Sequence, residues 1–330
     1  MDKQLYSYNW GCQYLENKNI DSSVLIRYNE PHRYYHTWNH IHQMLSFLNT
    51  DDKSLMLATL FHDIVYNPKE KDNEEKSAEL FKSVWKGDEQ TLNEVCQMII
   101  DTKTHVPTNE KSKILLEADL SIFKQSPEII AEYDKQIFKE YQFVDWKTYS
   151  QARLIALEEL SKIVYKTFNK TIYDGLFFCI EYTKTFQPKI GVFTGSFNPF
   201  HIGHQNVLEK AEKVFDKVII ARGINTDKKN DDFRMLPKHL EYHQQEMYHS
   251  LVTDFIKELK YPVTLIRGIR NAKDFEYELM MNQYIQDINK GVGIPTTMFL
   301  CDREFAHVSS SAIKTLPKKE QEMYLTFNKK

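Results

Sequence analysis

The sequence predicts two domains of different fold class: an all-α domain over residues 1–186 and an α/β domain with a parallel sheet over residues 187–330. Three observations support this division. The chain has 330 residues, more than one compact core usually needs. Apolar residues recur with helical spacing through the first half. In the last third, short apolar runs alternate with helical stretches instead, which is typical of β-α-β units.

Helical spacing is clearest in two stretches of the first domain. In SLMLATLFHDIVY, which begins at Ser54, apolar side chains recur at i, i+3 and i+4 and form one stripe: Leu57, Leu60, Phe61, Ile64 and Val65. The stretch QARLIALEELSKIV, which begins at Gln151, repeats this spacing. Residues 1 to about 183 contain few glycines and no convincing alternating strand, so we predict helices only.

The composition excludes several classes of partner. A net charge of −3 gives no electrostatic sign of binding to nucleic acid or an anionic membrane, so neither is expected as a partner. The first residues lack the basic and apolar regions of a signal peptide, and no run of 18 apolar residues occurs. The four cysteines are far apart and form no CxxC pair. Reduced thiols in a cytoplasmic protein are therefore expected.

The pattern of apolar residues changes at residue 187. Gln187 and Pro188 interrupt the helical pattern, and the apolar run 190–193 predicts a short strand. The next stretch is helical, with an apolar stripe formed by Val207, Leu208, Ala211, Val214 and Phe215. KVIIAR, from Lys217, predicts a second strand and completes a β-α-β unit. YPVTLIRG and TTMFLC predict later strands of the same parallel sheet.

The joint between the first strand and its helix reads FTGSFNPFHIGH. In open α/β sheets, ligands bind at the carboxyl ends of the strands. Gly195 permits close approach of the backbone, Pro199 stiffens the loop, and the N-terminus of the following helix offers N–H groups to an anion. His201 and His204 are expected at the mouth of that helix. The combination predicts a phosphate-binding site.

This joint resembles the HxGH nucleotidyltransferase superfamily, whose sheet is Rossmann-like. LIRGIRNAKDFEYE and HVSSSAIK resemble signatures of bacterial phosphopantetheine adenylyltransferase, and the resemblance covers residues 189 to about 316. It implies transfer of the adenylyl group of ATP, bound with Mg²⁺, to the phosphate of 4′-phosphopantetheine. The products are dephospho-CoA and pyrophosphate. Because the acceptor phosphate is itself the nucleophile, the enzyme supplies position and charge stabilisation.

The resemblance also implies roles for single residues. His204 stabilises charge at the α-phosphate, Lys228 contacts phosphate, and Arg267 meets the acceptor; Ser310 completes the catalytic set. Ser196, Lys228 and Arg267 form the implied acceptor site. The implied ATP site consists of Ser196, Phe197, His201, His204, Gly268, Ile269, Arg270, Glu278, Phe305, Ala306, His307, Val308, Ser309, Ser310 and Ser311.

The identity of the acceptor stays open at this point. Phosphopantetheine enzymes usually carry Thr-Asn-Gly-His where this chain has His-Ile-Gly-His, from His201 to His204. GSFNPFHIGH is more similar to the nicotinate and nicotinamide mononucleotide adenylyltransferases, so a pyridine mononucleotide is the alternative acceptor. RGIRNAKDFEYE favours phosphopantetheine. Members of that family form hexamers, which implies a possible homo-oligomer.

The first domain carries histidines and carboxylates in an informative order, in YHTWNHIHQML, LFHDIVY and LLEADL. His62 and Asp63 end an apolar helical stripe, where two polar side chains are costly without a partner. A histidine-rich helix start lies about 20 residues earlier, and Asp119 follows within a later apolar stripe. Imidazole and carboxylate together suit a divalent metal, and Mn, Fe, Ni, Zn and Mg all stay candidates.

This H…HD…D order resembles the HD superfamily of metal-dependent phosphohydrolases over about residues 25–180. The resemblance implies an HD-type helical domain that hydrolyses a phosphate ester through a metal-activated water. The implied ligands are His40, His62, Asp63, Asp119 and, as a further candidate, His36. Residues expected behind the ligands or at the substrate are His105, Asn73 and Glu74. The alternatives are that the histidines only pack with neighbouring aromatic rings, or that the domain binds a metabolite and regulates without turnover.

Overall fold

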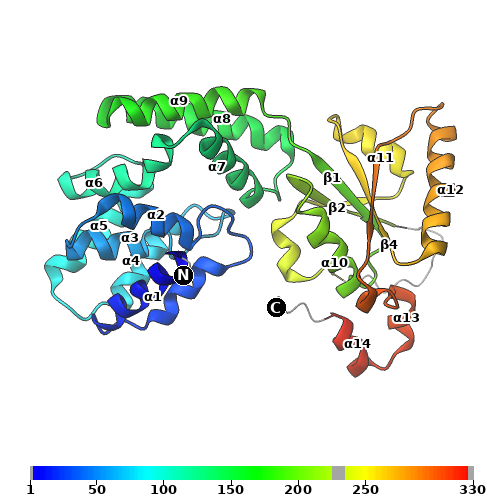
Figure 1. Cartoon of the computed structure of the whole chain (residues 1–330), viewed down its shortest axis with the longest axis horizontal. Helices are drawn as coiled ribbons and strands as arrows, with labels where there is room; N and C mark the ends of the chain where they lie inside the picture. The colour runs from blue at the N-terminus through cyan, green and yellow to red at the C-terminus, as the bar shows by residue number, and fades with distance from the viewer. Residues whose placement is uncertain (1–2, 225–234, 326–330) are drawn as a thin grey trace. The chain divides into compact units, whose positions relative to one another are not determined.

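The structure is a computed structural model that describes residues 3–224 and 235–325. The chain divides into two compact units, Met1–Tyr141 with Trp146–Phe186, and Gln142–Asp145 with Gln187–Lys330. Figure 1 shows helices throughout the first unit and a sheet with helices in the second. Across the described ranges, no helix combines the length and apolar character that crossing a membrane requires.

Helices make up the first unit. They are α1 (Lys3–Glu16), η1 (Ser22–Asn29), α2 (Trp38–Leu48), α3 (Lys53–Phe61), α4 (Asn73–Val84), α5 (Glu89–Thr102), α6 (Glu110–Asp119), η2 (Leu120–Lys124), α7 (Pro127–Glu140), α8 (Trp146–Thr167) and α9 (Lys170–Thr185). Several begin at a polar residue whose side chain accepts from a backbone N–H of the first turn, as Asp52, Asp88 and Asn109 do. These capping residues determine where the helices begin.

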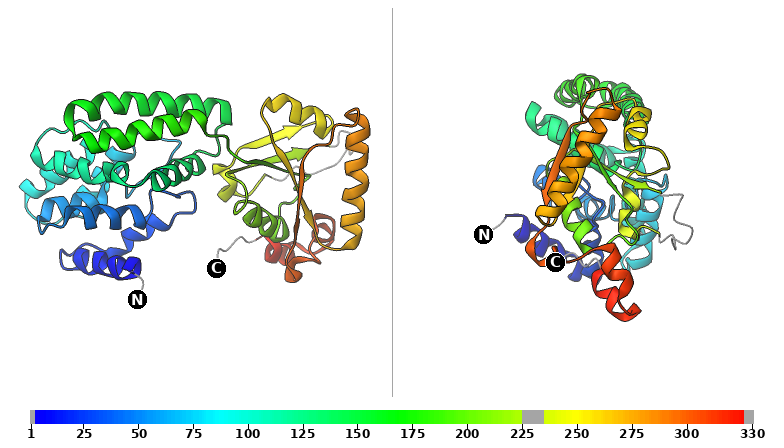
Figure 2. Two further views of the ribbon diagram at one scale, coloured as in Figure 1. Left: turned by 45° about the horizontal axis from the view of Figure 1, so that its top comes forward. Right: turned by 90° about the vertical axis from the view of Figure 1, so that its right-hand side faces the viewer.

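Two apolar clusters form the core of this unit. The first gathers α2, α3, α5 and their neighbours, and it buries Leu57, Leu60, Phe61 and Ile64, which confirms the apolar stripe predicted before His62. The second joins η2 and α7 to the pair α8 and α9, which lie beside one another in Figures 1 and 2. The histidine-rich segments therefore stand on a rigid helical base.

Gly175 lies where α9 meets η2. A Cβ atom at this position would stand 1.8 Å from the carbonyl oxygen of Phe123. Neither backbone can move far, because Phe123 and Leu176 beside it are buried in the second cluster. Glycine is thus required here for the approach of two backbones and not for an unusual torsion angle.

We expect Gly175→Ala to destabilise the protein by about 1–2 kcal/mol. Alanine gains about 1 kcal/mol over glycine in a free helix, but overpacking costs about 1–3 kcal/mol. The clash with a backbone atom places this cost in the upper part of that range, at about 2–3 kcal/mol. Urea unfolding followed by far-UV circular dichroism measures the change. Thr171→Ala, at an exposed position of the same helix, is the control. An unchanged or higher unfolding midpoint for Gly175→Ala contradicts the expectation.

The second unit is built on a five-stranded parallel sheet. Its strands are β1 (Ile190–Gly195), β2 (Lys217–Gly223), β3 (Gln245–Tyr248), β4 (Thr264–Ile269) and β5 (Thr296–Leu300), in the order β3-β2-β1-β4-β5. The helical elements are α10 (Ile202–Ala211), η3 (Lys238–Tyr242), α11 (Val252–Leu259), α12 (Ala272–Ile288), η4 (Arg303–Phe305), α13 (Ser310–Thr315) and α14 (Lys318–Leu325). Figure 1 shows α10 on one side of the strands and α12 on the other.

The strand order reverses between β1 and β4. From β1 the chain passes through α10 to β2 and then to β3; it returns through α11 to β4 and continues through α12 to β5. In open parallel sheets, such a reversal opens a crevice at the carboxyl ends of the two central strands. The phosphate-binding loop predicted after the first strand leaves β1 at this crevice.

The four predicted strands are confirmed, while β3 was missed because this edge strand alternates exposed and half-buried residues over only four positions. The helix after β1 is shorter than predicted. It ends at Ala211, and Val214 beyond it is 52% exposed. Phe215 still packs into the core, but from the turn that leads to β2.

The four residues Gln142–Asp145 belong to the second unit, although they lie between α7 and α8 and within the predicted first domain. The ammonium group of Lys217, which is 1% exposed, donates to the carbonyls of Gln142 (2.7 Å) and Val144. The backbone N–H of Gln244 also donates to Gln142, at 3.1 Å. Burial lowers the pKa of Lys217 to about 7, and the two carbonyl oxygens stabilise the charged form of its ammonium group.

Candidate functional site

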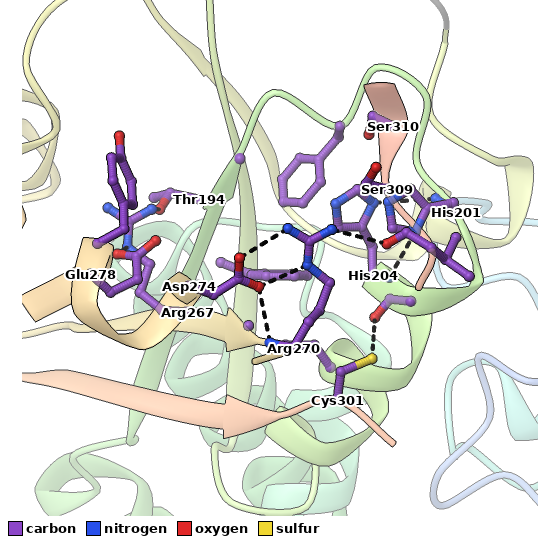
Figure 3. Close-up of a pocket in the computed structure, with 18 residues that line it drawn as sticks. Thr194, His201, His204, Arg267, Arg270, Asp274, Glu278, Cys301, Ser309 and Ser310 are labelled. Atoms are coloured by element: carbon purple, nitrogen blue, oxygen red, sulfur yellow. Dashed lines mark hydrogen bonds and ion pairs between the residues drawn. The ribbon is translucent and has the colours of Figure 1, made fainter. Parts of the chain in front are cut away.

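A pocket of ≈ 340 Å³ opens at the carboxyl ends of β1 and β4, as the crevice rule requires. Figure 3 shows the side chains that line it. The predicted residues that line the pocket are Phe197, His201, His204, Arg267, Gly268, Arg270, Glu278, Val308, Ser309 and Ser310. The others do not line it: Ser196, Ile269, Phe305, Ala306, His307 and Ser311. Lys228 lies outside the described residues.

His201 and His204 cap the start of α10 for one another. Nδ1 of His201 accepts from the backbone N–H of His204 at 3.4 Å, and Nδ1 of His204 accepts from that of His201 at 3.2 Å. Both rings therefore carry their proton on Nε2. They stack with centroids 3.6 Å apart. Gly203 leaves room for this arrangement, because a Cβ atom there would stand 3.1 Å from the ring of His201.

Both histidines are neutral N–H donors at pH 7. Burial, with the nearby charge of Arg270, lowers the pKa of His201 to about 4. Burial also holds the pKa of His204 well below its usual range, and His201 and Arg270 add to the effect. A neutral imidazole that keeps its Nε2–H at the mouth of a helix suits an anion, since its hydrogen bond needs no prior proton uptake.

Two arginines leave the end of β4 and are held by carboxylates of α12 (Figure 3). Nη1 of Arg267 donates to the hydroxyl of Thr194 at 2.6 Å, and its Nε lies 3.2 Å from Glu278. Arg270 makes a two-pronged contact with Asp274, at 2.8 and 3.1 Å. Burial raises the pKa of Glu278 although Arg267 opposes the rise, whereas the hydrogen bonds of Arg270 outweigh burial and lower the pKa of Asp274.

The segment before α13 closes the far side of the pocket. Ser309 caps α13 by accepting from the N–H of Ala312 at 3.2 Å. The hydroxyl of Ser310 donates to the carbonyl of Pro199 at 2.9 Å, which ties this segment to the loop after β1. Both serines face the pocket, as Figure 3 shows.

Sequence reasoning missed four pocket residues of chemical interest: Thr194, Asp274, Tyr277 and Cys301. For Asp274 a signal was present, because it stands four residues after Arg270, the spacing of a helical ion pair. The others carry no pattern of their own. They reach the pocket because parallel strands end at one edge of the sheet.

In the first unit, the four predicted ligands come together from three helix ends. His40 lies in α2, His62 and Asp63 follow α3, and Asp119 ends α6. Nε2 of His40 lies 3.2 Å from Nε2 of His62 and 3.1 Å from Oδ1 of Asp119. Oδ2 of Asp63 lies 2.9 Å from Nε2 of His62 and 3.6 Å from Nε2 of His40. Both imidazoles are 2% exposed.

The ligand atoms of His40, His62 and Asp63 lie within 4.8 Å of one another and can share a cation. Asp119 joins them through His40, because its Oδ1 lies 3.9 Å from Nε2 of His62. Two ligand atoms bound to one ion at about 2.1 Å stand about 3.0–3.4 Å apart in tetrahedral or octahedral geometry. His62 is also oriented for this role, because its Nδ1 faces the carbonyl of Thr59 at 3.0 Å and leaves Nε2 for the cluster. Burial lowers the pKa of His62, but the charge of Asp63 outweighs it and raises that pKa to about 9. A divalent ion binding here must displace this proton.

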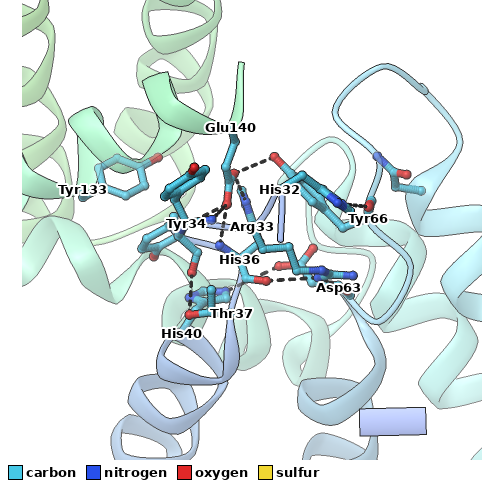
Figure 4. A network of polar contacts seen from close by, with 12 residues as sticks. His32, Arg33, Tyr34, His36, Thr37, His40, Asp63, Tyr66, Tyr133 and Glu140 are labelled. Carbon is cyan, nitrogen blue, oxygen red and sulfur yellow. Dashed lines mark hydrogen bonds and ion pairs between the residues drawn. The ribbon is translucent and has the colours of Figure 1, made fainter. Parts of the chain in front are cut away.

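His36 is held apart from the cluster by Glu140, which sequence reasoning missed (Figure 4). Nδ1 of His36 donates to Glu140 Oε2 at 2.6 Å, and the hydroxyl of Tyr66 donates to the same oxygen at 2.6 Å. Oε1 accepts from the backbone N–H groups of residues 34, 35 and 36 at 2.8–2.9 Å. The His36 ring lies 6.1 Å from that of His40, so His36 borders the cluster.

Arg33 was also missed and supports the cluster from behind. Its buried guanidinium donates to the carbonyl of Asp63 at 2.7 Å and to that of Ile64 at 3.1 Å. A third bond reaches the carbonyl of His36 at 3.0 Å. One side chain thereby fixes the backbone on both sides of the cluster.

The remaining predicted residues differ in their placement. Nε2 of His105 lies 3.3 Å from Oδ2 of Asp119, where it can orient that carboxylate. Glu74 is half-buried, and burial with the nearby charge of Asp63 raises its pKa. Asn73 instead closes a loop with Asn67. Its side-chain oxygen accepts from the backbone N–H of Asn67 at 2.9 Å, and its side-chain nitrogen donates to the carbonyl of Asn67 at 3.0 Å.

Comparison with known proteins assigns the class of the second unit. Residues 192–316 match the cytidylyltransferase-like family. With the parallel sheet and the histidine-capped loop, this match makes the second unit a nucleotidyltransferase-type domain.

Individual relatives narrow the class. The chain is 36% identical to the phosphopantetheine adenylyltransferase of Rhodopirellula baltica over 137 residues, which cover 38% of this chain and 74% of that protein. It is 32% identical to the phosphopantetheine adenylyltransferase of Clostridium botulinum strain Eklund 17B over 142 residues, 39% of this chain and 85% of that protein. It is 33% identical to the phosphopantetheine adenylyltransferase of Porphyromonas gingivalis strain W83 over 136 residues, which cover 38% of this chain and 86% of that protein. Through its C-terminal part, the chain belongs to the phosphopantetheine adenylyltransferase family.

We expect Glu140→Gln to cost about 2–4 kcal/mol of stability at pH 7, because five donors lose a buried carboxylate charge. The ion pair with His36 and these hydrogen bonds outweigh burial and lower the pKa of Glu140 below its ordinary 4.5. A depressed pKa stabilises the fold above the unfolded-state value, and this contribution disappears as pH falls through the folded-state value.

The difference between wild type and Glu140→Gln should therefore shrink below about pH 4.5, where the protonated acid resembles the amide. Urea unfolding at pH 7 and at pH 4 measures it. Glu132→Gln, at an exposed position of α7, is the control at both values. A difference that stays constant with pH shows that the charge of Glu140 is not what stabilises the fold.

Proposed function

We propose that the second unit transfers the adenylyl group of ATP to 4′-phosphopantetheine, yielding dephospho-CoA and pyrophosphate. One observation carries the proposal: two neutral imidazole donors and two arginines face one pocket of ≈ 340 Å³ at the crevice of the sheet. Helix-capping N–H donors and guanidinium groups suit phosphates. The acceptor is inferred from the relatives, each of which is called a phosphopantetheine adenylyltransferase.

The proposed reaction needs no covalent enzyme intermediate. An oxygen of the acceptor phosphate attacks the α-phosphorus of ATP, the bond from that phosphorus to the bridging oxygen breaks, and pyrophosphate leaves. The nucleotide substrate is the Mg²⁺ complex of ATP. We assign the Nε2–H of His204 to an α-phosphate oxygen on which charge develops. Arg270 and Ser310 hold the triphosphate, and Arg267 holds the acceptor phosphate. Ser196, which does not line the pocket, stays a proposed acceptor contact on the strength of the sequence resemblance alone.

Because His204 is neutral, it supplies a directed hydrogen bond and no net charge. The positive charge must come from Arg267, Arg270 and the metal bound to ATP. Lys228, outside the described residues, stays a proposed phosphate contact. A pyridine mononucleotide stays the alternative acceptor, since His201 stands where phosphopantetheine enzymes usually have threonine.

Isosteric substitution at His204 tests the assignment. In His204→Asn, the amide oxygen can still accept from the N–H of His201, but the Nε2–H is lost; His204→Gln keeps an N–H near Nε2. We expect the Asn variant to lose about 10²–10³ in kcat and the Gln variant to lose less. Pyrophosphate release, measured with phosphopantetheine and with nicotinamide mononucleotide as acceptors, reports the change.

His249→Asn, at an exposed position, is the control for that experiment. Wild-type protein should prefer phosphopantetheine, and the opposite preference reverses the choice of acceptor. Near-normal turnover by a folded His204→Asn variant removes His204 from the chemistry.

We also propose that the first unit hydrolyses a phosphate ester at the cluster of His40, His62, Asp63 and Asp119. The converging ligand atoms, which lie 2.9–3.9 Å apart, carry this proposal. A divalent ion bound there supplies a water of lowered pKa and polarises the ester. Asp63 and Asp119 hold the cation by charge, His105 orients Asp119, and Glu140 fixes the ring of His36 at the border of the cluster. A metabolite-binding module without turnover is the alternative.

We expect Asp63→Ala to lose the divalent metal and any phosphatase activity, yet to keep adenylyl transfer within about twofold. The carboxylate neutralises part of the cation's charge and has no replacement in the buried cluster. The two sites stand on separate cores, so the second should not respond. Elemental analysis, hydrolysis of p-nitrophenyl phosphate and pyrophosphate release on one preparation measure the three properties.

Asp51→Ala, exposed before α3, is the control. Retained metal in Asp63→Ala shows that the ligand set is wrong. Metal bound by wild type without hydrolysis of this or other phosphate esters favours the regulatory alternative. Loss of adenylyl transfer in a folded variant means that the two sites are coupled.

Partners and location stay predictions: ATP and phosphopantetheine as small-molecule partners, a cytoplasmic protein, and a possible homo-oligomer. The last is supported by α12, which exposes large apolar side chains along its length: Phe275, Tyr277, Leu279, Met280, Tyr284 and Ile288.

A further inference from the structure

We infer that Asp274 is a positioning residue for the nucleotide: it fixes the guanidinium group of Arg270 and, through Arg270, the segment that ends at Ser310. The inference rests on the proposed function of the second unit as an ATP-dependent transferase. Asp274 itself touches no phosphate in this account, because a carboxylate repels one. Its role is to fix the position of the positively charged guanidinium group of Arg270 before ATP binds.

The contacts of Arg270 support this role (Figure 3). Its Nε donates to Oδ2 of Asp274 at 2.8 Å, and Nη2 donates to Oδ1 at 3.1 Å. The backbone N–H of Arg270 donates to Oδ2 as well, at 3.0 Å. Nη1 donates to the carbonyl of Val308 at 3.3 Å. The carboxylate thus holds both the side chain and the backbone of Arg270.

Counting donors shows what remains for a ligand. A guanidinium group has five N–H groups in a rigid plane. Two of them go to Asp274 and one to Val308, which leaves one on each terminal nitrogen among these described contacts. One N–H on each terminal nitrogen is what a bidentate contact with two phosphate oxygens uses. Arg270 lines the pocket beside His201 and His204, whose pKa values its charge helps to lower.

The local structure places Asp274 independently of any ligand. Asn271 caps α12 by accepting from the N–H of Asp274 at 3.1 Å, so the aspartate stands in the first helical turn. A carboxylate there interacts favourably with the helix dipole and is one turn from Arg270. The same helix presents Glu278 to Arg267 one turn later, but at a single distance of 3.2 Å. The two-pronged contact is special to Asp274.

The link to Val308 extends the effect across the pocket. Val308 is buried and precedes Ser309 and Ser310, the cap and first residue of α13. If the guanidinium of Arg270 loses its orientation, this carbonyl loses a charged donor. Asp274 therefore preorganises two sides of the proposed triphosphate site, and preorganisation lowers the cost of binding.

Asp274→Asn tests the inference because two effects predict opposite signs. Removing a negative charge near a triphosphate should by itself tighten ATP binding. If Asp274 acts by positioning Arg270, binding must weaken, and we expect the Kd of MgATP to rise about tenfold, with the KM of the acceptor changed less than twofold. Isothermal titration calorimetry with MgATP alone measures Kd. Asp287→Asn, exposed at the other end of α12, is the control with the same charge change.

A double substitution separates positioning from a general loss of structure. In an Arg270→Gln background, Asp274→Asn should leave the Kd of MgATP unchanged or lower it, since the group it positions is gone. Asp274→Glu keeps the charge but shifts the carboxylate, so its Kd for MgATP should fall between those of wild type and Asp274→Asn. It replaces the Asn variant in the test if that variant fails to fold. A tenfold weakening in the Arg270→Gln background overturns the inference, as does unchanged or tighter binding in Asp274→Asn alone.

Failure of the inference is distinguishable from failure of the proposed function. Wild type that binds MgATP but releases no pyrophosphate with phosphopantetheine refutes the acceptor, while the calorimetric comparison still decides the role of Asp274. Wild type that turns over normally while Asp274→Asn binds MgATP as wild type does refutes only the inference. Wild type that binds no MgATP refutes both.

Discussion

A buried imidazole keeps its proton only where its neighbours favour it, and both sites of this chain depend on that constraint. At the start of α10, backbone N–H groups occupy Nδ1 of His201 and His204, burial disfavours a second proton, and both rings stay neutral donors. Beside α3, Asp63 outweighs the same burial and raises the pKa of His62. The same residue type is thus a neutral hydrogen-bond donor in one unit, whereas in the other it holds a proton that a bound cation has to displace.

The surrounding structure serves these two arrangements. In the first turn of α10, Gly203 leaves room for the ring of His201, and the reversal of strand order brings the arginines at the end of β4 to the same edge of the sheet. Around the cluster, Arg33 holds the backbone of residues 63 and 64, while Glu140 gathers the N–H groups of residues 34–36. Each site therefore consists of a few reactive groups and a larger number of groups that orient them.

The sequence could predict those features of the fold and the sites that depend on residues close together along the chain. The strand, loop and helix around His204 follow one another along the chain, and His62 and Asp63 end an apolar stripe, so the elements that carry them were readable. Glu140 was not, because it meets His36 across 104 residues and sits in an ordinary amphipathic helix. The place of residues 142–145 in the second unit was not readable either, since these residues contact the distant Lys217.

The charges of the pocket must also be balanced when no ligand is bound. Two arginines in a partly buried site are costly unless anions accompany them. Asp274 and Glu278 meet that need, so the pocket is close to neutral before phosphate enters, with both histidines uncharged. The two pairs differ in strength: Arg270 is held on two edges and again by Val308, whereas Arg267 has one carboxylate contact and the hydroxyl of Thr194. A phosphate entering the site exchanges partners more easily with Arg267. Within the proposed reaction, Arg270 is then the fixed element that orients the nucleotide, and Arg267 is the one that turns toward the acceptor.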